Sequence, residues 1–202
     1  TFQASGGARF HWCFLASVCA GSSIWGTHFI AMLGYQPGVP VTFDATLTIV
    51  SAVIAIVGVG IGLLFSCLRN RWLAAICGGG TIGLSISAMH YVGMFAYRAD
   101  GIVSWLPGYV AASLICAVIF GTLAVDRLRA HGGDSHPWVP TGLLVTAIVM
   151  LHFVGMAAFS VTPIANFGSG PQSDVFVAMA AAIAMAALLM VGTGISTYLV
   201  EM

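Results

Sequence analysis

The sequence predicts an all-α integral membrane protein with six transmembrane helices, arranged as three repeated helical hairpins in a pseudo-threefold bundle. Hydrophobic residues make up 59% of the 202 residues, charged residues only 6%, and the mean hydropathy is +1.02. A soluble domain averages about 25% charged residues. Six apolar stretches approach the ~20 residues that a helix needs to cross a bilayer. A histidine motif also recurs at a fixed interval of 62 residues.

The six predicted spans follow one another as three hairpins within a single domain, residues 1–202. The spans lie at about 11–34, 45–68, 73–97, 107–126, 138–160 and 175–199. The hairpins form repeats at about 11–68, 73–128 and 138–199. The first stretch continues as a full span, unlike the short apolar run of a removable signal peptide. Polar and apolar residues do not alternate with period two, which disfavours a membrane β-barrel.

The arginines predict that both termini of the chain are cytoplasmic. The chain has six Arg, six acidic residues and no Lys, a balance that excludes the broad basic surface needed to bind nucleic acid. Short cytoplasmic loops accumulate positive charge. Five arginines fall on one predicted side of the bilayer: Arg9, Arg69, Arg71, Arg127 and Arg129. The connections on the other side contain Arg98, Asp44, Asp100 and Asp174.

The repeated motif places a histidine and a methionine on the same face of spans one, three and five. The three copies read THFIAML (27–33), MHYVGMF (89–95) and LHFVGMA (151–157). Each methionine follows its histidine by four residues, and residues i and i+4 share a helix face. The predicted topology puts the histidines in the outer half of the bilayer. The candidate site residues are His28, Met32, His90, Met94, His152 and Met156.

A single copy of this motif would have a structural explanation. One histidine in a membrane helix often hydrogen-bonds a neighbouring helix, and one methionine is usually apolar filler. Three equivalent copies favour a function, because ionisable residues at membrane depth are rare and helix packing does not require methionine at a fixed distance from histidine.

Imidazole nitrogen together with thioether sulfur favours copper, because thioether selects Cu(I) and imidazole binds both oxidation states. Calcium and magnesium prefer oxygen ligands, and the acidic residues lie in loops or at the ends of spans. The spans contain no carboxylate pair, nucleophile elbow or phosphate-binding loop. The sequence therefore predicts a ligand-binding protein and not an enzyme.

The glycines in spans two and three predict close helix packing. Gly58, Gly60 and Gly62 lie in span two, and 78–80 is a run of three glycines in span three. These glycines lack the strand–turn–helix context of a nucleotide-binding loop. Small residues let membrane helices approach one another closely.

The motif MHYVGM closely resembles that of the MHYT domain, a bacterial integral membrane sensor module, and the resemblance covers nearly the whole chain. Thr27 and Leu151 replace the leading methionine, Met89, in the other two copies, and phenylalanine replaces Tyr91 there. Neither the leading methionine nor the tyrosine hydroxyl is therefore needed in all three repeats.

The resemblance implies a copper site near the outer face of the bacterial inner membrane. It also implies a sensor of a diatomic gas (O2, CO or NO) or of copper itself. Such domains typically precede cytoplasmic signalling domains, often the diguanylate cyclase and phosphodiesterase pair that handles cyclic di-GMP. The chain ends directly after the predicted sixth span, so we expect a sensor module cut from a longer parent chain.

Two alternative functions stay open at this point. The first is a copper transporter or channel, although no further ligands continue towards the cytoplasmic half. The second is a haem protein with two axial histidines, which would leave the third histidine and the repeated methionines without a role. The sequence is compatible with a homodimer and does not decide whether the six ligands form one copper site or two.

Overall fold

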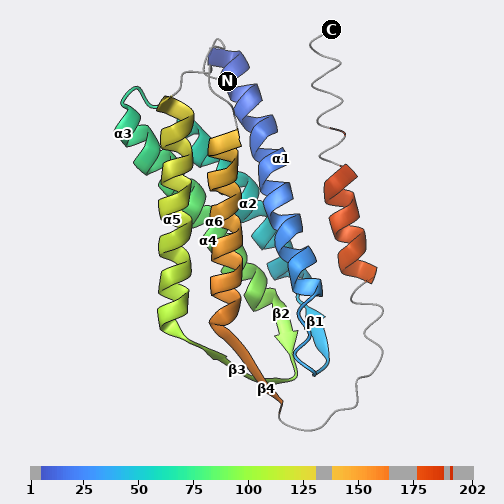
Figure 1. Cartoon of the computed structure of the whole chain (residues 1–202). Coiled ribbons are helices and arrows are strands. Elements are labelled where there is room, and N and C mark those ends of the chain that lie inside the picture. The colour runs from blue at the N-terminus through green and yellow to red at the C-terminus, as the bar shows by residue number, and fades with distance from the viewer. Residues whose placement is uncertain (1–5, 131–137, 164–176, 189–191, 193–202) are drawn as a thin grey trace.

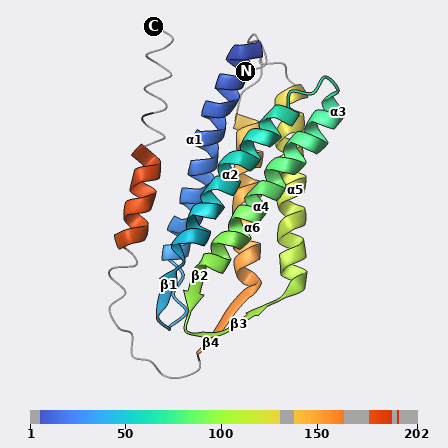
Figure 2. The ribbon, with the colours of Figure 1, turned by 180° about the vertical axis from the view of Figure 1, so that it is seen from behind.

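The computed structural model describes residues 6–130, 138–163, 177–188 and 192, with side chains from residue 11 onward. Long helices lie side by side, and short strands lie together at one end of the bundle (Figures 1 and 2). We call this end the strand end. The opposite end, where α3 lies, is called the arginine end because Arg69 and Arg71 lie there.

Five of the six predicted spans are long helices that are apolar enough to cross a membrane. The helical elements are α1 (Gly6–Leu33), α2 (Ala45–Phe65), α3 (Arg71–Leu73), the π-helix η1 (Ala74–Gly79), α4 (Gly80–Ala96), α5 (Pro107–Ala130) and α6 (Trp138–Ala157). The elements α3, η1 and α4 form one uninterrupted run that corresponds to span three.

The sixth predicted span is described only in part. A shorter apolar helix covers Val177–Leu188. Apart from residue 192, the remainder of the predicted span 175–199 lies outside the described residues. Six spanning helices and the pseudo-threefold arrangement therefore stay predictions.

The helices that follow the first two motifs pack between the helices that hold the histidines. Helix α2 contacts both α1 and α4, and α5 contacts both α4 and α6. A Cβ atom on Gly83 of α4 would lie 2.5 Å from the carbonyl oxygen of Ala117 in α5. Gly21 of α1 meets the backbone of Ala55 and Ile56 in α2 in the same way, so the 62-residue interval recurs in these helix contacts.

The predicted packing role of the glycines in spans two and three holds for most of them. A Cβ atom on Gly62 would lie 2.5 Å from the Ile82 side chain, and one on Gly79 would lie 2.4 Å from the carbonyl oxygen of Gly121. Gly80, by contrast, has no heavy atom of another residue near its missing side chain. The first two glycines thus allow α2 and α5 to approach the run that contains α4.

Short strands occupy connections that the sequence analysis treated as loops. Strand β1 (Val41–Phe43) pairs antiparallel with β2 (Tyr97–Ala99), and β3 (Gly101–Trp105) pairs antiparallel with β4 (Phe159–Pro163). Each pair joins the connection that follows one motif helix to the end of the next motif helix. The ladders satisfy backbone groups directly beyond the helices, where an unpaired group that loses water is costly.

The arginine end is held by polar contacts between α3, α5 and the preceding turn. The Arg71 guanidinium donates two hydrogen bonds of 2.8 Å to the Asp126 carboxylate. Arg129 donates a 2.8 Å hydrogen bond to the carbonyl oxygen of Leu68. These contacts fix the turn between α2 and α3 against α5.

Candidate metal centre

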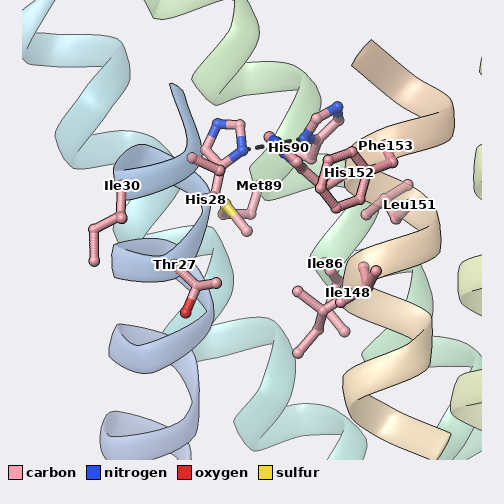
Figure 3. A pocket seen from close by; sticks show the side chains of 12 residues that line it. Thr27, His28, Ile30, Ile86, Met89, His90, Ile148, Leu151, His152 and Phe153 are labelled. Carbon is pink, nitrogen blue, oxygen red and sulfur yellow. Dashed lines mark hydrogen bonds between the residues drawn. The ribbon is translucent and has the colours of Figure 1, made fainter. Parts of the chain in front are cut away.

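The three motif histidines converge from three different helices. His28 lies on α1, His90 on α4 and His152 on α6, and one nitrogen from each ring lies within 4.8 Å of the others (Figure 3). Their ring centroids are 4.8 Å, 5.5 Å and 5.5 Å apart. His28 and His90 are buried, and His152 is half-buried. We call these three residues the histidine layer.

The histidine layer has more hydrogen-bonding capacity than its described surroundings use. The Nδ1 atoms of His28 and His90 are 3.2 Å apart, so one neutral ring can donate to the other. Three further ring nitrogens are buried without a hydrogen-bond partner among the described residues: Nε2 of His28, Nε2 of His90 and Nδ1 of His152. An unsatisfied buried polar group typically costs about 1–3 kcal/mol, so three in one place require an explanation.

Two glycines make room for this arrangement, and the sequence analysis did not identify them. Gly93 and Gly155 each follow a motif histidine by three residues. A Cβ atom on Gly93 would lie 2.6 Å from Nε2 of His28, and one on Gly155 would lie 2.5 Å from Nε2 of His90. Each histidine ring therefore occupies the space beside the glycine of the next motif. The shared letters V-G-M in two motifs were the available signal.

The three motif methionines lie together one helical turn nearer the strand end. Met32 and Met94 are each 1% exposed, and Met156 packs against the same apolar cluster. The cluster also contains Tyr35, Tyr97 and Phe159, whose ring centroids are 5.9–6.2 Å apart. We call Met32, Met94 and Met156 the methionine layer.

The aromatic residues around the methionine layer are uncharged at neutral pH. Burial raises the pKa of the Tyr35 and Tyr97 hydroxyls. The Tyr97 hydroxyl donates to the backbone carbonyl of Tyr35 at 3.3 Å. The nearest acid in the adjoining connection, Asp44, has a lowered pKa because the Leu47 N–H donates to its carboxylate and Arg98 lies 3.5 Å away.

Tyr91 distinguishes the second motif from the other two. Its hydroxyl lies 2.6 Å from the Ser113 hydroxyl of α5, and its ring contacts the His90 ring at 4.9 Å between centroids. The corresponding residues Phe29 and Phe153 have no hydroxyl. The hydrogen bond thus links α4 to α5 beside the histidine layer.

An apolar cavity of about 250 Å³ borders the histidine layer. All three histidines line it, together with Thr27, Ile30, Ala31, Ile86, Met89, Ile148, Val149, Leu151 and Phe153 (Figure 3). None of the three residues of the methionine layer lines this cavity. The structure therefore brings the six predicted site residues together as two layers, and it places only the histidine layer beside an open volume.

A family model described as the bacterial signalling protein N-terminal repeat, MHYT, matches residues 21–79 and again residues 83–134. The chain belongs to the MHYT family. These matches include the first two motifs, so the family resemblance deduced from the sequence is confirmed. The helices of this MHYT domain fit a multi-pass bacterial membrane protein.

The MHYT domain is also similar to several signalling proteins. It is 35% identical over 171 residues to an uncharacterized signaling protein of Caulobacter vibrioides, covering 81% of this chain and 20% of that protein. It is 35% identical over 159 residues to the cyclic di-GMP phosphodiesterase NbdA of Pseudomonas aeruginosa, covering 73% of this chain and 20% of NbdA.

A third relative is the bifunctional diguanylate cyclase/cyclic di-GMP phosphodiesterase MucR of Pseudomonas aeruginosa. It is 31% identical over 162 residues, covering 77% of this chain and 24% of MucR. The chain thus spans about a fifth to a quarter of the length of these relatives, so the rest of their length lies outside the region that this MHYT domain matches. No solved structure matches the chain.

Proposed function

We propose that this MHYT domain is a membrane-embedded sensor module that binds copper through His28, His90 and His152. The observation behind this proposal is the cluster of three imidazoles from three helices, in which each ring has a buried nitrogen without a hydrogen-bond partner among the described residues. A bound metal ion would satisfy such nitrogens.

The donor set favours copper over other metals. Neutral imidazole is a good ligand for both oxidation states of copper, and the thioethers of the methionine layer offer weaker donors one helical turn away. Among the described residues, the histidine layer is the only group of three or more His, Cys, Asp or Glu side chains placed to share an ion. When bound there, copper would supply a coordination position for a diatomic gas such as O2, CO or NO.

The same observations weigh against the two alternative functions. A copper transporter or channel needs a succession of ligand sites, whereas the described residues contain a single such cluster. A haem needs a large cleft, and the cavity of about 250 Å³ lies below the roughly 300–1,000 Å³ of pockets that hold drug-sized ligands. A Soret band in the absorption spectrum of the purified protein would reinstate the haem alternative.

We further infer that this domain regulates a cytoplasmic output domain of a longer parent chain. NbdA and MucR are cyclic di-GMP enzymes by name, and the chain matches only 20–24% of their length. Their enzymatic activity therefore has ample sequence outside the matched region. The corresponding output for this chain would be the synthesis or hydrolysis of cyclic di-GMP. A homodimer is compatible with this role, because nothing in the site requires a second chain.

The orientation that we propose puts the strand end at the outer face of the bacterial inner membrane and both termini in the cytoplasm. It follows from the arginines at the opposite end. In a cysteine-free background, a membrane-impermeant thiol reagent added outside should label Ser104→Cys in β3 and not Asn70→Cys beside α3. Both positions are exposed in the structure. The reverse labelling pattern would invert the proposed topology.

Gas binding is tested directly by the infrared spectrum of carbon monoxide on the copper-loaded protein. We expect a C–O stretching band that is present in the wild type and absent in His90→Ala at the same copper concentration. A wild-type protein that holds copper but shows no such band would contradict the gas-sensing part of the proposal, leaving copper itself as the sensed ligand.

A further inference from the structure

The cavity beside the histidine layer opens to the side of the bundle, between α1 and α6. Helix α2 fills the space between α1 and α4, and α5 fills the space between α4 and α6, but α1 and α6 have few direct contacts. Ile30 of α1 and Phe153 of α6 line the cavity and are 57% and 66% exposed. None of the described residues of the helix Val177–Leu188 lines it. The opening therefore faces the surroundings of the apolar helices, which is the bilayer.

The route from the strand end to the histidine layer is closed. Met32 and Met94 are each 1% exposed, and Phe159 is 6% exposed. The strand pair β1–β2 adds Val41, which is 4% exposed, to the same cluster. A solute that arrives from the aqueous side must displace this packed apolar cluster.

The lining of the cavity selects against charged and strongly polar solutes. Apart from the three histidines, Thr27 is the only polar side chain in the lining, and its hydroxyl donates to the Ser23 carbonyl at 2.8 Å. No charged residue lines the cavity. Moving an ion into such surroundings without a partner is very costly, whereas an apolar cavity of roughly 150 Å³ stays dry and binds xenon or benzene.

We propose that the opening between α1 and α6 is a lateral port through which small uncharged apolar molecules pass from the lipid to the histidine layer. The identification of the arriving molecule as a sensed gas rests on the proposed function. The port itself does not depend on copper. Dissolved gas in the bilayer would thus reach the histidines directly, while ions and polar solutes in the water would be excluded.

Xenon tests the port in the metal-free protein. Met89 lines the cavity and is 1% exposed, so its ¹³C-labelled methyl group reports on the cavity by NMR, and Met94 in the methionine layer serves as an internal control. We expect xenon to shift the Met89 methyl signal saturably and to leave the Met94 signal nearly unchanged. Assignment of both signals follows from Met89→Leu and Met94→Leu.

Two valine variants separate the port from general effects on the protein. Val149 lines the cavity and is 42% exposed, whereas Val57 lines a groove between α2 and α4 that holds no histidine and is 53% exposed. Val149→Phe should weaken the xenon-induced shift at least about tenfold, and Val57→Phe should leave it unchanged. If Val149→Phe does not fold, Ala31→Leu narrows the opening from α1 and should have the same effect.

An unshifted Met89 signal in the wild type, or equal shifts in the wild type and both narrowing variants, would overturn the port. This outcome is independent of metal binding. In the copper-loaded protein, the rate of carbon monoxide rebinding after a light flash should also fall at least about tenfold in Val149→Phe and not in Val57→Phe. A protein that binds xenon as expected but no copper would refute the proposed function and leave the port intact.

Discussion

The histidine layer and the methionine layer have the same sequence interval but different surroundings. Both recur every 62 residues on the same three helices, four residues apart. The histidine layer has three buried nitrogens without partners among the described residues and borders a cavity. The methionine layer is packed within an apolar cluster next to the strands. Repetition in the sequence therefore identifies residues that lie together, but not which of them bind a ligand.

The difference has a physical origin in the neighbouring side chains. Gly93 and Gly155 leave space for the rings of His28 and His90, so these rings are close to one another without being filled in by other atoms. Methionine, in contrast, is flexible and fills irregular apolar space well. We infer that the histidine layer is shaped for a ligand and that the methionine layer mainly closes the strand end.

The largest expected effect is the loss of copper on removal of one histidine. His90→Ala deletes the ring that contacts both other members of the histidine layer. Copper affinity should fall by at least about a hundredfold, because imidazole is the strong donor of the set. Isothermal titration with a competing chelator measures it, and His11→Ala, outside the layer, is the control. Equal affinities in the two variants would remove the distinction between the layers.

A smaller effect is expected when the histidine layer is displaced without losing a ligand. Gly155→Ala puts a Cβ atom 2.5 Å from Nε2 of His90, which must move. Copper affinity should fall about 10–100-fold, the range typical when a group that orients a metal ligand is changed. Gly80→Ala is the matched control, since no heavy atom of another residue lies within 4 Å of its added methyl group. An unchanged affinity in Gly155→Ala would mean that the layer adjusts freely.

The smallest effect is expected in the methionine layer. Met94→Leu keeps nearly the same apolar volume, so the free energy of unfolding should change by less than about 1.5 kcal/mol. Copper affinity should fall by less than about tenfold, because thioether is a weak donor. Chemical denaturation and the same copper titration measure both quantities. A loss as large as that of His90→Ala would make the methionines primary ligands and reverse the comparison.

The limits of the helices could be predicted well wherever a local signal marks them. Helix α2 begins at Ala45 as predicted, because the Asp44 carboxylate accepts a 3.0 Å hydrogen bond from the Leu47 N–H. Helix α5 begins at Pro107 as predicted, and proline suits the first turn of a helix. The same helix continues to Ala130, four residues beyond its predicted end at residue 126, because Arg127 and Arg129 extend it outside the apolar stretch.

The strands and the cavity could not be predicted, because both depend on distant segments. The strands have three to five residues, too few for a clear alternation, and each forms only because a second strand about 56–58 residues away lies beside it. The cavity depends on the separation of α1 and α6, which no local pattern specifies. The convergence of the histidines followed from their interval, whereas the space for their rings depends on Gly93 and Gly155, whose role needs the neighbouring helix to be seen.

The most direct test of the central claim is X-ray absorption at the copper edge, combined with elemental analysis, on the purified copper-loaded protein. The claim is that one imidazole from each motif holds a single metal ion. It predicts one copper per chain, with three nitrogen donors and at most one long, weak sulfur contact. A first coordination shell dominated by short copper–sulfur distances, or copper that does not bind in stoichiometric amount, would contradict it.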